Sequence, residues 1–256
     1  MDYQTFNTVN QISAMLDTNP DNWRNYVTLA RNVMASMHTL APSADPTERQ
    51  RQNWHIDVFQ RLAYSDVDNG GVADIANWCV RQALTLLQHQ PEDVDLLRLV
   101  GQNWLLRAQP CLARIHLLDG HSSSSGGSHG ATASAFSLSR SEEERQAARA
   151  AAEAEDRLHT ADYVEASGIL LPAVEYLARA VGVAQSQGRL TGHLLATAAE
   201  GYMSLGNVSS MRINDRYFHQ ALAYLRLAEN LPGYTLPTHL QQYLADYGPY
   251  DLLNEE

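Results

Sequence analysis

The residues that could bind a metal are few and poorly placed for that task. Cys111 and His116 are five positions apart, which puts them on different faces of a helix, while His121 and His129 fall in a stretch rich in serine and glycine. Zinc needs ligands held in a fixed tetrahedral arrangement. We therefore predict no metal site and no cofactor. Cys79 occupies a small-residue position in a helical pattern, so we expect a buried and unreactive thiol there.

Known catalytic motifs are not found in the sequence. There is no nucleophile elbow, no His-Glu-x-x-His and no Gly-x-Gly-x-x-Gly pattern. Acidic pairs such as Asp93 with Asp95 are two positions apart and do not share a helix face. These observations give no support to catalysis, and an all-helical enzyme with a dispersed site is the last-ranked alternative.

The basic residues are all arginines. Lysine and arginine together number 18, and every one of them is arginine. Chemistries that need an ammonium group, namely a Walker-A phosphate loop, a kinase lysine or a Schiff-base lysine, are therefore excluded. Two explanations stay open. A GC-rich genome writes arginine in place of lysine, and a lysine-free surface resists self-tagging in a protein that works beside ubiquitin ligases.

Composition and charge narrow the class of protein further. A chain of 256 residues with 45% hydrophobic residues can bury a core. Its formal net charge of -11 opposes binding to the phosphate backbone of nucleic acids. There are two cysteines, no secretory leader pattern and no apolar run near the roughly 20 residues of a membrane span. We expect a soluble protein of a reducing compartment, in the cytoplasm, the nucleus or both, with no membrane partner.

The hydrophobic pattern predicts an all-α fold. Apolar residues recur at three and four positions almost throughout, and alternating β-branched runs are nearly missing. Prolines, glycines and capping residues divide the pattern into about eleven helices. The predicted helices cover residues 3–16, 20–37, 47–64, 72–90, 94–107, a short segment from 110, then 139–163, 172–186, 190–205, 214–230 and 237–246, with a turn-rich loop at 65–71.

One stretch is predicted to lie outside the helices. Residues 120–138 are rich in serine and glycine and contain little that is apolar, so they cannot offset their ordering entropy by burial. We expect a disordered loop that separates an N-terminal helical half, residues 1–119, from a C-terminal half, residues 139–256. Ser141 begins the next helix as an N-cap, with Glu144 reaching back, and both Ser139 and Ser141 match what an acidophilic kinase accepts.

Helix patterns repeat along the chain. Leu97-x2-Val100-Gly101-x2-Trp104 returns about a hundred residues later as Leu195-x2-Ala198-Ala199-x2-Tyr202. Other helices carry a small residue four positions before a large one, a spacing that lets two helix backbones approach closely. These small-large pairs are Cys79 with Ala83, Ala113 with Leu117, Ala173 with Leu177 and Ala221 with Leu225.

On these motifs the chain resembles the tetratricopeptide-repeat family over residues 60–119 and 171–247. The predicted helices at 139–163 and 172–186 depart from the full pattern, and residues 207–216 insert about ten residues into the last turn. The resemblance implies a right-handed α-solenoid of antiparallel helix pairs. A compact bundle without repeats is the alternative.

The resemblance also implies a function. Helical-repeat solenoids hold peptides or other domains on an extended concave surface. We therefore expect a non-enzymatic scaffold or adaptor in an intracellular multiprotein complex, with a lysine-free subunit or substrate adaptor of a ubiquitin-ligase or quality-control complex as the alternative. A mixed, acidic groove favours a basic or amphipathic protein segment over a phosphorylated one, and no small-molecule substrate is expected. The predicted groove residues are Asp95, Arg98, Gln102, His193, Ala196, Glu200 and Met203.

Overall fold

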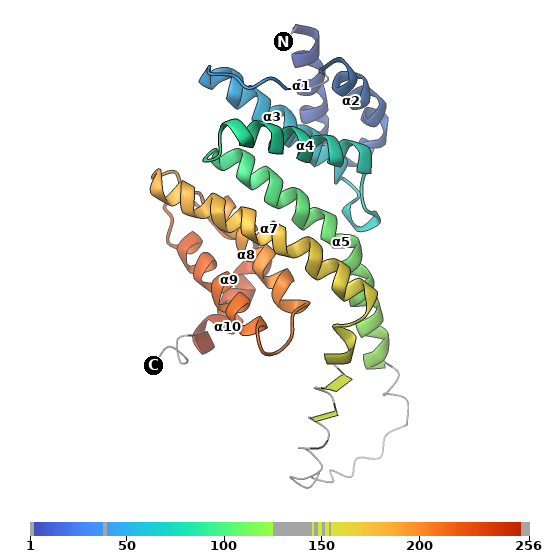
Figure 1. The fold of residues 1–256 in the computed structure, drawn as a ribbon, viewed down its shortest axis with the longest axis vertical. Coiled ribbons are helices and arrows are strands. Elements are labelled where there is room, and N and C mark those ends of the chain that lie inside the picture. Colours follow the sequence, from blue (N-terminus) through green and yellow to red (C-terminus); the bar gives the residue numbers. More distant parts are fainter. Residues whose placement is uncertain are drawn as a thin grey trace.

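The chain folds into a succession of helices. The computed structural model describes residues 3–37, 40–124, 145, 148–149, 152–153 and 155–251, which form helices, turns and loops without a strand. The all-α class predicted from the sequence is therefore confirmed. The helices follow one another along the long axis, from α1 at one end to α8, α9 and α10 nearer the other (Figure 1).

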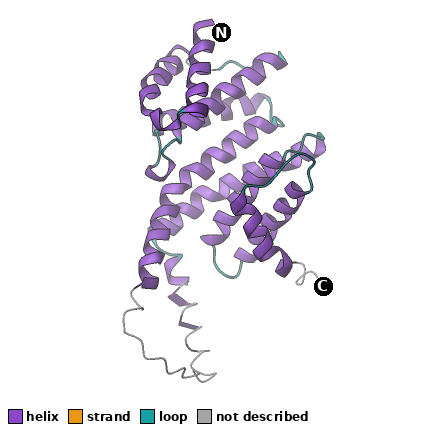
Figure 2. Cartoon of the chain, turned by 180° about the vertical axis from the view of Figure 1, so that it is seen from behind, coloured by secondary structure: helices purple, strands orange, loops and turns teal. Residues whose placement is uncertain are grey.

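Successive helices pack on one another. Contacts join α3 to α4, α4 to α5, α5 to α7, α7 to α8 and α8 to α9, and α5 and α7 run side by side through the middle of the molecule in both views (Figure 1 and Figure 2). The elements are α1 (Tyr3–Thr18), η1 (Pro20–Asn22), α2 (Arg24–Met37), α3 (Pro46–Ala63), η2 (Val67–Asn69), α4 (Ala73–His89), α5 (Val94–Ser124), α7 (Ala161–Ser186), α8 (Gly192–Asn207), α9 (Asn214–Glu229) and α10 (Thr238–Asp251).

The turn between α3 and α4 forms where the sequence predicts it. Gly70 and Gly71 both have positive φ angles, of 84° and 64°, a conformation that favours glycine. At Gly71 a Cβ would lie 2.2 Å from the carbonyl oxygen of Ala63, so no larger residue fits. The next amide, of Val72, donates to that same oxygen at 2.7 Å. This turn returns the chain so that α4 packs against α3.

Two prolines predicted to begin helices lie inside helices instead. Pro110 is within α5, and Pro172 is within α7. A proline in a helix interior removes one hydrogen bond and costs roughly 3 kcal/mol. The helix continues through Pro110 because the neighbouring Ala108 and Cys111 are buried on the same core. The predicted helices at 94–107 and from 110 onward are thus one helix, α5.

The predicted loop begins later than expected. Helix α5 continues through Ser124, so residues 120–124 are helical, since extending an existing helix adds one hydrogen bond for each residue fixed. Residues 125–144, which include most of the predicted loop with Ser139 and Ser141, lie outside the described residues. The helix predicted at 139–163 ends earlier, because residues 158–160 form a turn before α7 begins at Ala161.

Helix α7 is central to the fold. By length and composition alone it could cross a membrane, contrary to the expectation that no segment is apolar enough. Buried core helices of soluble proteins meet the same criteria, so this is weak grounds for a membrane span. Its residue Leu177 is fully buried, and positions on both neighbouring helices approach it. A Cβ on Gly101 of α5 would lie 2.7 Å from Leu177 Cγ, and a Cβ on Gly201 of α8 would lie 3.3 Å from Leu177 Cδ1.

The small-large packing predicted from the repeats is therefore present at this point. At Gly101 the backbones are close enough that a Cβ would also lie 3.0 Å from the carbonyl oxygen of Ala173. In a regular helix pair the two packed helices are joined by a short turn. Gly101 and Leu177 come instead from α5 and α7, with residues 125–160 between these helices. Close packing of α5 on α7 fixes the position of the start of α8.

Candidate functional site

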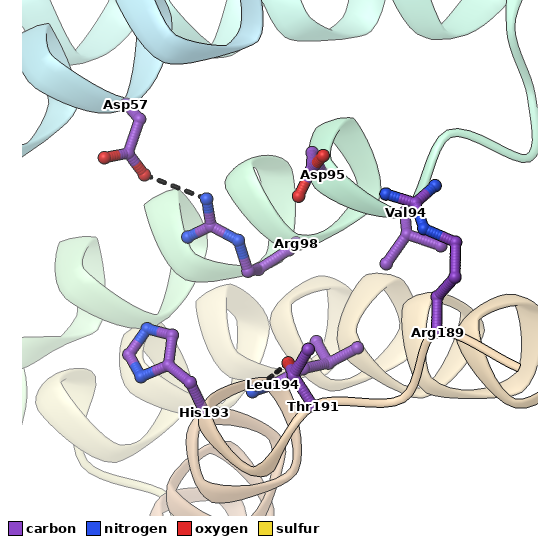
Figure 3. Close-up of a pocket in the computed structure, with 8 residues that line it drawn as sticks. All are labelled: Asp57, Val94, Asp95, Arg98, Arg189, Thr191, His193 and Leu194. Carbon is purple, nitrogen blue, oxygen red and sulfur yellow. Dashed lines mark hydrogen bonds and ion pairs between the residues drawn. The ribbon is translucent and has the colours of Figure 1, made fainter. Parts of the chain in front are cut away.

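A hollow of about 380 Å³ lies where the two halves of the chain meet. Helix α3, the first turns of α5, and the turn leading into α8 surround it (Figure 3). Most of the side chains that line it are polar or charged: Asp57, Asp95, Arg98, Arg189, Thr191 and His193. The hollow therefore combines groups from three segments that are far apart in the sequence.

Capping interactions position the two helices that open onto the hollow. Asp93 Oδ1 accepts a hydrogen bond from the amide of Leu96 at 3.0 Å, which satisfies one free amide at the start of α5. Asn53 of α3 donates to the same carboxylate at 3.2 Å, so α3 and the start of α5 are tied together. Thr191 Oγ1 likewise accepts from the amide of Leu194 at 3.3 Å and caps α8. The side chains of the first turns of α5 and α8 are thereby held toward each other.

Two of the charges at the hollow neutralise each other. Arg98 Nη2 lies 2.9 Å from Asp57 Oδ1, and the two side chains are 18% and 28% exposed. Arg98 Nη1 also donates to Gln102 Oε1 at 2.8 Å. Because both ends of the guanidinium are engaged, Arg98 is a fixed structural link between α3 and α5.

Two other charges at the hollow stay unpaired. Among the described residues, neither the carboxylate of Asp95 nor the guanidinium of Arg189 has a hydrogen-bond or ion-pair partner, and no dashed line joins them in Figure 3. Arg189 is exposed in the turn that follows Gly188, whose φ of 64° reverses the chain between α7 and α8. The hollow thus offers one free anion and one free cation to a ligand.

Arg189 also borders a second hollow, of about 310 Å³, between the turn before α5 and the end of α7. Arg49 and Glu92 bring further charges to it. Gln187 Nε2 donates to the carbonyl oxygen of Glu92 at 3.1 Å, and Arg179 Nη2 donates to that of Pro91 at 2.6 Å, which fastens the end of α7 to this turn. We call the two adjoining hollows, which share Arg189, the charged groove.

Comparisons of the chain with protein-family models, curated proteins and solved structures find no match. The chemistry of the site therefore has to come from its residues alone. Among the described residues, no group of three or more histidine, cysteine, aspartate or glutamate side chains is arranged to hold a metal ion. The groove suits recognition of a polar, charged ligand.

The structure brings together part of the predicted groove. Asp95, Arg98 and His193 line the first hollow, and Gln102 supports Arg98 from the next turn of α5. Ala196 does not belong to an open surface, because it is only 4% exposed and packs in the core. The prediction treated one face of α8 as open along its length, whereas only its first turn reaches the hollow.

The remaining two predicted residues lie farther along α8. Glu200 Oε1 is 3.1 Å from His239 Nε2 of α10, so its charge faces that helix. Met203 is half-buried and packs against the core. Neither lines the charged groove.

Sequence reasoning missed Asp57, Arg189 and Thr191. Asp57 pairs with Arg98 across 41 positions, and the turn that carries Arg189 and Thr191 lies almost a hundred positions beyond Asp95. Opposite charges at such separations give no local signal. The predicted thiol, in contrast, is confirmed: Cys79 is fully buried, and burial raises the pKa of its thiol above the ordinary value.

Proposed function

We propose that this chain is a non-enzymatic helical-repeat adaptor, a right-handed tetratricopeptide-like α-solenoid, that binds a segment of a protein partner in the charged groove. The observation that carries the proposal is the pair of free charges, Asp95 and Arg189, in a hollow built from distant parts of the chain. Charged groups left without partners at the edge of a folded protein are available to a charged ligand at little cost of rearrangement.

The form of the groove favours a protein segment over a small molecule. Sites for small molecules are concave, mostly apolar and cover most of the ligand surface. Here the lining of both hollows is dominated by charged and polar side chains, and two hollows adjoin at Arg189. An extended segment that passes from one hollow to the other would use both.

The stacking order of the helices gives further support. From α4 to α10, each described helix contacts mainly those next to it in the sequence, which is how repeat solenoids are built. In such an arrangement the ends of several helices meet along one side. The charged groove is formed at such a side, by the beginnings of α5 and α8 and by α3.

Site-specific crosslinking in the source cells tests the proposal. A photoreactive amino acid at His193, which is exposed in the groove, should form a crosslink to a protein partner, and the same amino acid at Arg212 should not. Arg212 is a suitable control because it is exposed, as His193 and Arg189 are. It lies in a turn and, among the described residues, has no side-chain partner. The identified partner, once purified, should bind Arg189→Glu more weakly than Arg212→Glu. Crosslinks at position 212 alone, or equal binding by both variants, would reject the groove as the binding site.

A further inference from the structure

The charges that line the groove indicate the chemistry of its partner. The ion pair of Asp57 with Arg98 is already complete, so these two residues add little net charge to the first hollow. Among the charged side chains that line it, Asp95 and Arg189 are the two whose charge no described residue neutralises. They have opposite signs and come from opposite sides, α5 and the turn before α8 (Figure 3).

A ligand that covers this hollow removes water from both charges. Desolvating a charge is unfavourable unless an opposite charge replaces the water. A purely basic segment would satisfy Asp95 but would place like charge against Arg189, and a purely acidic segment would do the reverse. A neutral segment would leave both charges without a partner.

We infer that the partner segment carries charges of both signs, with a basic side chain that pairs with Asp95 and an acidic side chain that pairs with Arg189. This inference rests on the proposed function and narrows it, because the sequence alone indicated a basic or amphipathic segment. Arg189 contributes two donor edges suited to a carboxylate and is shared by both hollows. The acidic residue of the partner is therefore the anchor.

A random peptide library displayed on phage, selected against the full chain, provides a defined probe. Peptides enriched by the wild-type protein should contain an arginine or lysine and an aspartate or glutamate at a recurring separation. Asp95→Lys should remove the selection for the basic position, and Arg189→Glu should remove the selection for the acidic one. The double variant should select the two charges in the reverse order. Arg212→Glu should select the same peptides as the wild type.

Affinities of one enriched peptide give the size of the effect. Each single variant should bind it at least tenfold more weakly, which is the range seen when one partner of a desolvated charge pair is lost. Circular dichroism and thermal unfolding of each variant check that the fold is intact, which is expected because Arg189 is exposed and Asp95 is half-buried in the first turn of α5, where its side chain has no described partner.

The outcomes separate this inference from the proposed function. If enriched peptides carry charge of one sign, yet lose affinity for the groove variants, the groove binds peptides and the two-sign inference is wrong. If no peptide is enriched, or if the enriched peptides bind all variants equally, the groove is not a peptide site and both proposals fail. Enrichment of two-sign peptides that invert with the double variant supports both.

Discussion

The N-terminal region, α1 to α4 with the first half of α5, adds buried hydrogen bonds to its apolar core, whereas the apolar core of the C-terminal region, α7 to α9, relies on small residues in close contact. Among the described residues, the buried polar side chains of the N-terminal region are Thr5, Gln52, Asn53, His55, Gln60, Gln82 and Asn103, and the C-terminal region buries Thr197 alone. The core of α7 and α8 instead contains many alanines, among them Ala166, Ala173, Ala180, Ala184, Ala198 and Ala199.

A network at the centre of the N-terminal region shows how the polar groups are used. Asn103 of α5 donates to Gln60 Oε1 of α3 at 2.9 Å and to the carbonyl oxygen of Ala76 of α4 at 3.2 Å. Tyr64 OH donates to the carbonyl oxygen of Asn103 at 3.1 Å. One buried side chain thus links three helices. Hydrogen bonds specify which groups must meet, while small residues specify only how near two backbones come.

The difference can be measured because the chromophores are divided between the regions. All four tryptophans, at positions 23, 54, 78 and 104, lie in the N-terminal region, and α7 to α10 contain tyrosines without tryptophan. Tryptophan fluorescence therefore reports unfolding of the N-terminal region, and far-UV circular dichroism reports both. Unfolding in urea followed with both signals therefore separates the effect of a variant on the two regions.

The largest effect is expected from Asn103→Ala. The change leaves the buried Gln60 Oε1 without its donor, which costs about 1–3 kcal/mol, and removes a second hydrogen bond worth about 1 kcal/mol to the carbonyl oxygen of Ala76, which keeps its helical partner, so we expect a loss of roughly 2–4 kcal/mol in the free energy of unfolding. The transition seen by tryptophan fluorescence should move to lower urea. Asn77→Ala on the exposed face of α4 is the matched control and should change stability by less than about 1 kcal/mol. Similar losses for both variants would show that the network is not what stabilises this region.

The next effect depends on pH. His55 is fully buried, both of its ring nitrogens have no hydrogen-bond partner, and burial lowers its pKa from 6.5 to about 4. The unfolded chain therefore binds a proton that the folded chain does not bind between these two pH values. Stability is complete above the unfolded pKa and is lost as the pH falls, by about 3 kcal/mol near the folded pKa.

A neutral replacement isolates this contribution. The difference in unfolding free energy between neutral pH and about pH 5 should be roughly 2 kcal/mol smaller for His55→Leu than for the wild type. The tryptophan signal should carry most of the change, because Trp54 lies beside His55, with ring centroids 5.1 Å apart. An identical pH dependence in the two proteins would mean that folding does not lower the pKa of His55.

The sequence predicts the close packing of small residues better than it predicts the buried hydrogen bonds. Spacing of apolar residues at three and four positions predicts the all-α fold. Leu177 of the predicted pair Ala173 with Leu177 lies at a close contact between helices, although the sequence did not predict that Gly101 is the residue that approaches it. Hydrogen bonds such as that of Asn103 with Gln60 join positions 43 apart, and no local sequence pattern predicts them. Pro110 and Pro172 led to wrong helix boundaries for a related reason. Burial in the tertiary structure keeps these helices continuous although a proline locally favours a helix start.

The residues of the candidate site also divide into those that local sequence patterns predict and those that they do not. Asp95, Arg98 and His193 follow from helix faces, so helical periodicity predicts them. Arg189 and Asp57 enter only through the packing of distant segments. Ala196 fails because periodicity alone cannot tell which face of α8 another helix covers.

The close contact in the middle of the molecule gives a smaller effect. Gly101→Ala would push a methyl group against Leu177 and the backbone of Ala173, and overpacking of this kind costs about 1–3 kcal/mol. Gly182→Ala is the matched control, because nothing lies within 4 Å of its Cβ position in α7. Alanine is the better helix former, so this change should stabilise the protein by up to about 1 kcal/mol. Equal signs for both changes would contradict the close approach of α5 and α7.

The smallest effect expected is the coupling energy of the ion pairs. Its measurement tests whether the two regions also differ at their surfaces. Asp57 and Arg98 are mostly buried at 28% and 18% exposure, whereas the Glu200 and His239 pair of the C-terminal region is 41% and 65% exposed. A double-mutant cycle with Asp57→Asn and Arg98→Met should give a coupling energy of about 1 kcal/mol, near the upper end for such pairs, and added salt should reduce it only slightly. The cycle with Glu200→Gln and His239→Asn should give a value nearer to zero, because both side chains are exposed to water and the pair is ionic only when the imidazole is protonated. Equal coupling energies would mean that the fixed position of Arg98 comes from Gln102 and the packing of α5, and the charged groove would then keep its shape without the ion pair.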